Sequence, residues 1–121
     1  IRDYSVVMPV PLHVKRLRER GFNQSLVLAK EIAGRHKLKL DYLSLERVVP
    51  TPPQIHLGRQ DRERNVRGAF EVTKPSRVRG EKIIVVDDVY TTGSTAGECA
   101  RALMRSGAAG VAILTLSRAL S

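Results

Sequence analysis

Two adjacent carboxylates, Asp87 and Asp88, are the residues of this chain best placed to do chemistry. They follow residues 83–86, an unbroken apolar run rich in β-branched side chains. Such a run is typical of a central strand that is covered on both faces. Ligands of an open α/β sheet bind beyond the carboxyl ends of parallel strands. The order therefore predicts that the two acids sit where a buried strand ends, facing a ligand.

A turn rich in hydroxyl groups follows the acid pair and leads into a helix. Consecutive backbone N–H groups, small hydroxyls and a helix N-terminus together bind a phosphate monoester well. Neighbouring carboxylates can accept hydrogen bonds from the two hydroxyls of a ribose. The combination predicts a site for a sugar phosphate, with the 5′-phosphate held by Thr91, Thr92, Gly93, Ser94 and Thr95.

This segment resembles the phosphoribosyl pyrophosphate (PRPP) signature of the type I phosphoribosyltransferases, in which an apolar strand, two acids and two variable residues precede Thr-Thr-Gly-Ser-Thr. The resemblance implies a transferase that binds PRPP, with Asp87 and Asp88 as the catalytic pair. Mg²⁺ is the expected cofactor, since it prefers carboxylates, substrate phosphates and retained waters. The segment is not a P-loop, because it lacks the Gly-Lys-Ser/Thr ending.

The expected reaction is displacement of pyrophosphate from C1 of PRPP by a nitrogen nucleophile. Purine-salvage members of the superfamily typically carry an aspartate three positions after the second acid, where this chain has Thr91. A threonine cannot act as a base near neutral pH. The sequence therefore disfavours a hypoxanthine or guanine acceptor, and it leaves the acceptor unidentified.

Arginines gather in two loops that are expected to border the same strand ends. The chain carries 21 Lys and Arg against 12 Asp and Glu, a formal charge of +9, which suggests a polyanionic partner. Arginine's planar fork pairs bidentately with phosphate oxygens. Taken singly, each arginine is expected to be a solvated surface charge, but the two groups together predict a pyrophosphate or anion site made by Arg16, Arg18, Arg20, Arg59 and Arg62.

Two further segments are similar to ComF-type (GntX-like) proteins: residues 9–24, with Pro9-Val10-Pro11-Leu12, and residues 51–70, which begin Thr51-Pro52-Pro53-Gln54. The resemblance implies one phosphoribosyltransferase-like domain over residues 1–121, with a hood at about 45–73. It also implies, for some members, a role in bacterial competence and DNA uptake. Family members usually carry an N-terminal zinc ribbon, which we expect to be absent from this chain because Cys99 is its single cysteine.

The pattern predicts an α/β domain of the type I phosphoribosyltransferase fold, a mostly parallel sheet flanked by helices, with a flexible hood loop. Strands are expected at 4–8, 45–49, 70–72, 83–86 and 111–116, and a helix at 23–37. A second helix should begin with a Thr95–Glu98 capping box and end at Gly107. Cys99 falls on its apolar face, and residues 74–81 are interpreted as a solvated loop.

A non-catalytic module that keeps the fold and binds single-stranded DNA is the alternative function. Such modules combine basic grooves with stacking aromatics, but aromatics are only 4% of this chain. Competence proteins are further candidate partners. No apolar stretch reaches membrane-spanning length and no secretory signal is visible, so we expect a cytoplasmic protein without membrane insertion.

Overall fold

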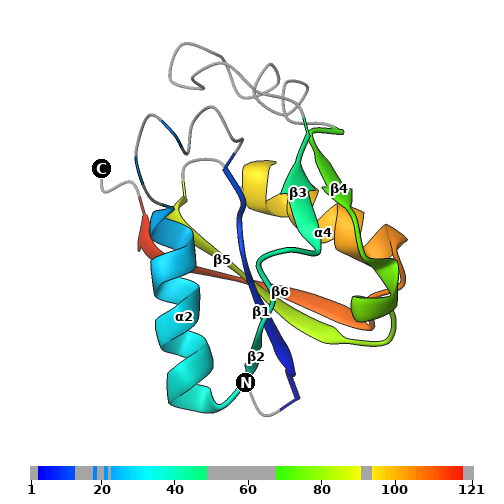
Figure 1. The fold of residues 1–121 in the computed structure, drawn as a ribbon, viewed down its shortest axis with the longest axis horizontal. Coiled ribbons are helices and arrows are strands. Elements are labelled where there is room, and N and C mark those ends of the chain that lie inside the picture. Colours follow the sequence, from blue (N-terminus) through cyan, green and yellow to red (C-terminus); the bar gives the residue numbers. More distant parts are fainter. Residues whose placement is uncertain are drawn as a thin grey trace.

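The computed structural model describes residues 3–12, 18, 21, 23–48, 68–90 and 94–118, of which 88–90, 94 and 116–118 are described by their backbone alone. Four parallel strands form one sheet in the order β2-β1-β5-β6, and β3 and β4 form a separate antiparallel pair (Figure 1). The elements are β1 (Val6–Pro9), α2 (Gln24–His36), β2 (Lys39–Leu40), β3 (Leu45–Arg47), β4 (Phe70–Val72), the 3₁₀ helix η2 (Pro75–Arg77), β5 (Lys82–Tyr90), α4 (Ser94–Arg105) and β6 (Gly110–Arg118).

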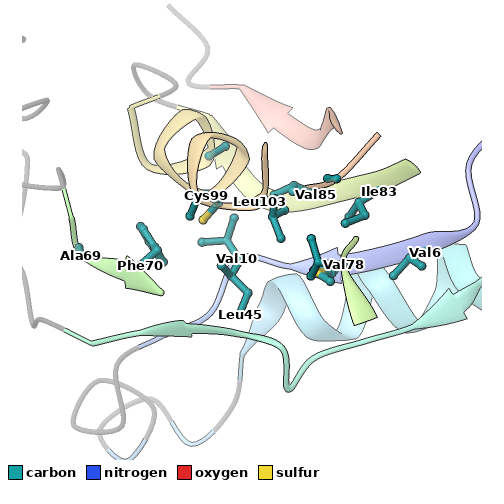
Figure 2. Close-up of a cluster of buried hydrophobic side chains, with 14 residues drawn as sticks. Val6, Val10, Leu45, Ala69, Phe70, Val78, Ile83, Val85, Cys99 and Leu103 are labelled. Carbon is teal, nitrogen blue, oxygen red and sulfur yellow. The ribbon is translucent and has the colours of Figure 1, made fainter. Parts of the chain in front are cut away.

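Each face of the parallel sheet has its own apolar layer. On one face α2 packs against β1 and β5, with Ala29 and Ala33 over Val7, Ile84 and Val86. On the other face α4 and the β3–β4 pair cover the alternate side chains of β1 and β5. Figure 2 shows this second cluster, which includes Val6, Val10, Leu45, Phe70, Val78, Ile83, Val85, Cys99 and Leu103. The predicted α/β class with a mostly parallel sheet is confirmed.

The expected helix at 23–37 is confirmed at both ends. Asn23 is its N-cap, and its side chain accepts a hydrogen bond from the N–H of Ser25 at 3.0 Å. Lys37 ends the helix in the left-handed conformation, with φ of 56°. Its N–H is bonded to the carbonyl of Ala33, which satisfies one of the free carbonyls at the helix end. The predicted left-handed Gly107 after α4 is also found, with φ of 99°.

Strand β5 is longer than its apolar run. The sequence predicted that Asp87 and Asp88 follow the end of the strand, but β5 continues to Tyr90. The pairing explains the difference: β1 leaves β5 at the Pro9–Val86 pair, whereas β6 stays paired to Tyr90. The acids therefore lie in the second half of β5, beyond the end of β1.

Two other sequence expectations were wrong. Residues 74–81 are not simply a solvated loop, because they contain η2 and because Val78 is completely buried in the larger apolar cluster. The capping box is not formed as expected, because α4 already begins at Ser94 and Glu98 bonds elsewhere. The two-residue strand β2 was not anticipated from the sequence. Cys99, by contrast, is buried as predicted.

Most of the hood, residues 49–67, lies outside the described part of the chain, so its predicted flexibility stays a prediction. Among the helices that the structure describes, none combines the length and the apolar character needed to cross a bilayer.

We expect Val78→Ala to lower the free energy of unfolding by about 2 kcal/mol, because it removes buried methyl groups and leaves a cavity. Val27, half exposed on α2, provides the control, since Val27→Ala should change stability by less than about 0.5 kcal/mol. Urea unfolding followed by circular dichroism measures both. Equal effects of the two substitutions would mean that the segment before β5 is not part of the core.

Candidate functional site

Asp87 lies on the inner strand β5, just beyond the point where the neighbouring strand β1 ends. Its predecessor Val86 is 1% exposed, whereas Asp87 itself is only partly buried. Strand alternation places Asp87 on the same face as Ile83 and Val85, which is the face covered by α4 and the β3–β4 pair. The N–H of Val10 donates to the carbonyl of Val86 at 2.9 Å, so the chain leaving β1 begins directly beside Asp87.

Hydrogen bonds hold both ends of the stretch that carries the first group of arginines. Val10 starts this stretch beside β5, and Asn23 closes it at the start of α2. The side-chain amide of Asn23 donates to the carbonyl of Val10 at 3.2 Å. Asn23 thus caps α2 and also holds the start of this helix next to Val10, at the carboxyl end of β1.

The stretch that carries the second group of arginines also leaves and returns near this edge. It departs after Val48, whose N–H donates to the carbonyl of Ala69 at 2.7 Å, and it returns at Gly68. The N–H of Gly68 donates to Oε1 of Glu98 on α4 at 3.1 Å. Figure 1 shows the open end of the β3–β4 pair on the same side of the sheet as the end of β1 and the start of α4.

Glu98 is a buried carboxylate with two partners. It is 6% exposed, and besides Gly68 it pairs with Nε of Arg101 through Oε2 at 3.7 Å. Sequence reasoning assigned it only to a capping box. No local pattern signals its observed role, because Gly68 lies thirty residues away in the chain.

Charged groups surround the buried thiol beneath this edge. Burial raises the pKa of Cys99 far above its usual range; Arg47 opposes the shift, and Asp87 and Glu98 add to it. The guanidinium of Arg47 also lies over the ring of Phe70, 4.9 Å from its centroid. A buried thiol with a raised pKa is a poor nucleophile. Asp87, Glu98 and Arg47 all lie close enough to the thiol to influence its pKa.

The structure describes only part of the predicted site. Asp87 and Thr95 are described fully and are partly buried, Asp88 and Ser94 are described by their backbone, and Arg18 is exposed. The remaining predicted site residues lie outside the described part of the chain: Thr91, Thr92, Gly93, Arg16, Arg20, Arg59 and Arg62. Their predicted contacts stay predictions. The described ends of the three segments that carry them lie near the carboxyl end of the parallel sheet.

The described residues contain no group of three or more histidine, cysteine or acidic side chains that could hold a metal ion by themselves. Asp87 is a carboxylate that could contribute to a Mg²⁺ site together with substrate phosphate oxygens and water. That donor set fits Mg²⁺, which commonly keeps several waters and binds through one or two carboxylates and substrate phosphates.

Residues 23–121 match the family described as "Phosphoribosyl transferase domain". The chain is 41% identical over 114 residues to the DNA utilization protein YhgH of Salmonella typhi, covering 94% of this chain and 49% of the relative. It is 35% identical to competence protein ComFC of Bacillus subtilis, covering 93% and 44%, and 32% identical to competence protein F of Haemophilus influenzae, covering 93% and 50%. The chain thus spans about half the length of these relatives.

Solved structures share the fold. The structure described as the allosteric regulatory enzyme of purine biosynthesis aligns with a TM-score of 0.59 at 20% identity, covering 92% of this chain and 21% of the other. Phosphoribosylpyrophosphate synthetase of Mycobacterium smegmatis aligns with a TM-score of 0.57 at 19% identity, covering 99% and 29%. These alignments confirm the predicted type I phosphoribosyltransferase fold.

We expect Glu98→Ala to destabilise the protein by about 1–2 kcal/mol, because Gly68 loses the acceptor of a charge-assisted hydrogen bond. Glu98→Gln keeps an acceptor oxygen of the same reach and should lose less. Denaturant unfolding compares the two. Hydrogen exchange of the Gly68 amide gives a local measure: it should be fastest in the alanine variant, and unchanged exchange there would show that the bond does not hold the start of β4.

Proposed function

Because this chain belongs to the phosphoribosyl transferase domain family and, with its competence-protein relatives, to the ComF type, we propose that it binds PRPP at the carboxyl edge of the sheet around Asp87. The signature at residues 82–96 supports the ligand class. The observation that carries the proposal is the meeting of segment ends: the chain after β1, the end of β5, the start of α4 and the open end of the β3–β4 pair.

Each segment has a proposed part in holding the ligand. Asp87 and Asp88 bind the ribose hydroxyls, directly or through Mg²⁺, and residues 91–95 hold the 5′-phosphate at the start of α4. The diphosphate on C1 is bound by the arginine-bearing stretches, with Arg16, Arg18 and Arg20 after β1 and Arg59 and Arg62 in the hood. Mg²⁺, when bound, supplies positive charge to the phosphate oxygens.

The proposed reaction breaks the bond between C1 and the pyrophosphate oxygen and forms a bond from C1 to a nitrogen nucleophile. The developing positive charge lies on the ribose, and the departing pyrophosphate carries the bonding electron pair. A site of this kind works by positioning the ribose and neutralising the leaving group. Asp87 fits the first task, since it projects from a strand whose preceding four residues are at most 4% exposed and are closely packed.

A DNA-binding role is the second candidate, and the names of the relatives favour it. They are called DNA utilization and competence proteins, and this chain has a formal charge of +9. In this alternative the arginines contact the phosphates of single-stranded DNA, and the ribose phosphate site is retained without turnover. Phosphate contacts of that kind make affinity strongly dependent on salt.

We expect calorimetry with PRPP and Mg²⁺ to detect binding, and the double substitution Asp87→Asn and Asp88→Asn to weaken it by about tenfold or more. Each charge-assisted hydrogen bond contributes about 1.5–3 kcal/mol, and 1.4 kcal/mol is a factor of ten in affinity. Asp3→Asn serves as the control, because Asp3 is exposed and lies three residues before β1 begins. Equal affinity of wild type and double variant would refute the assignment of the acid pair.

The arginines after β1 separate the two candidate functions. If they bind pyrophosphate, replacing Arg16, Arg18 and Arg20 by alanine should weaken PRPP binding by about tenfold or more while changing ribose 5-phosphate binding little. Only PRPP carries the second anionic group. Calorimetry with both ligands, together with titration of single-stranded DNA at several salt concentrations, provides the comparison.

The matched control removes the same charge elsewhere, at the exposed residues Arg77, Arg79 and Arg105. It should leave both sugar phosphates bound as in the wild type. If the first triple variant instead loses DNA binding and its affinities for PRPP and ribose 5-phosphate fall equally, the DNA-binding function is favoured. Release of pyrophosphate with a panel of bases and amines then tests turnover.

A further inference from the structure

The two edges of the parallel sheet differ sharply. The edge strand β2 has two residues and carries the exposed Lys39, and both shortness and a lysine protect an edge from pairing with another chain. The other edge strand, β6, has nine residues. Residues 110–117 include no charge and no proline, and their register with β5 runs without a bulge from Gly110 to Thr115. Within its first eight residues, β6 therefore lacks the charges and prolines that usually protect an edge strand.

The exposed side chains of β6 are apolar on both faces of the sheet. Ile113 is 42% exposed and Leu114 is 41% exposed, whereas their partners on β5, Val85 and Val86, are at most 1% exposed. The buried fraction of the side chains thus falls from almost complete on β5 to a little more than half on its neighbour β6. Ile113 lies on the face of α4, and Leu114 on the face of α2.

A hollow with an apolar floor continues this surface from β6 onto α2. Leu114, Val86, Leu28 and Ile32 lie in it, and the hollow has a volume of about 260 Å³. Its lining also includes His36 and the ion pair between Glu31 and Arg35. Helix α2 packs mainly on β1 and β5, so this face of β6 has no comparable cover in the described part of the chain.

We propose that a second copy of this chain pairs with β6, strand to strand and antiparallel, to form a two-fold symmetric dimer with an eight-stranded sheet. A two-fold axis perpendicular to the sheet at Leu114 pairs residue 110 with residue 118 of the partner and overlaps the strands along their whole length. Leu114 then meets its own copy on the α2 face, and Ile113 meets Thr115 of the partner subunit on the other face. Such an interface is isologous.

Charge favours a copy of the chain at this edge over a nucleic acid. A nucleic acid requires lysine or arginine, and the first eight residues of β6 have none. Two chains of charge +9 repel each other, and an uncharged strand is where they can approach with the smallest repulsion. In the proposed register, Arg118 falls opposite glycine and not opposite another arginine. Because the far edge of each sheet is the short β2, pairing ends at the dimer.

Sedimentation equilibrium of the wild-type chain over a range of concentrations tests the proposal. A monomer–dimer equilibrium should appear, and the dimer should tighten as salt rises, because salt screens the repulsion between the copies. DNA binding would show the opposite salt dependence. A monomer at every soluble concentration in high salt, or an open-ended series of oligomers, would overturn the proposal.

Substitution at the two-fold axis tests the register. L114K and L114E should each weaken the dimer by more than about tenfold, because like charges meet and two apolar contacts are lost. An equimolar mixture of the two variants should regain dimers, since opposite charges then face each other. Loss of dimer in the single variants without recovery in the mixture would overturn the register at Leu114.

The control is Val27→Lys, at an apolar side chain on α2 that is 50% exposed and outside the proposed interface. It should dimerise as the wild type does. Thermal unfolding by circular dichroism checks that all three variants fold. Leu114 and Val27 are both exposed in the wild type, so each variant should melt cooperatively. A folded L114K variant that dimerises like the wild type would overturn the proposal.

Discussion

The backbone hydrogen bonds that hold β5 between β1 and β6 are the constraint on which the rest of the structure depends. They fix a parallel register on both sides, from Val6–Ile83 on one and Lys82–Gly110 on the other. Residues 83–86 are consequently at most 4% exposed, with one apolar layer on each face. Because every neighbouring element is placed relative to this strand, the position of Asp87 follows from the register.

The two ends of the sheet are used differently. Away from the proposed site the polar groups satisfy one another. At the amino end of the sheet the hydroxyl of Ser5 donates to Glu81, and directly after β2 Asp41 accepts bonds from the Leu43 and Ser44 N–H groups and from the Ser44 hydroxyl. Burial opposes ionisation of Asp41, but these bonds and the charge of Arg77 lower its pKa below the ordinary value. These interactions stabilise the fold. The carboxyl end gathers loop ends and charged groups, as expected where an α/β sheet binds its ligand.

Helix α4 connects the buried core to the carboxyl end of the sheet. Its apolar stripe, including Cys99 and Leu103, is completely buried against β5 and the β3–β4 pair, which makes it a rigid support. From its second turn Glu98 reaches the returning hood segment at Gly68. A single helix therefore begins at the proposed phosphate loop and also holds the start of β4. This arrangement couples two segments that are far apart in the sequence.

The sequence by itself determined the elements with strong local signals and suggested the class of ligand that we propose. Asn23 as a cap, the left-handed Gly107, the apolar run at 83–86 and the acid pair all act over a few residues, so spacing alone reveals them. Tertiary structure decided what depends on distant partners. Pairing with β6 extends β5 through Asp87, packing buries Val78 in a segment of polar appearance, and Gly68 diverts Glu98 from a local cap. These outcomes arise from hydrogen bonds and burial between segments that no local pattern encodes.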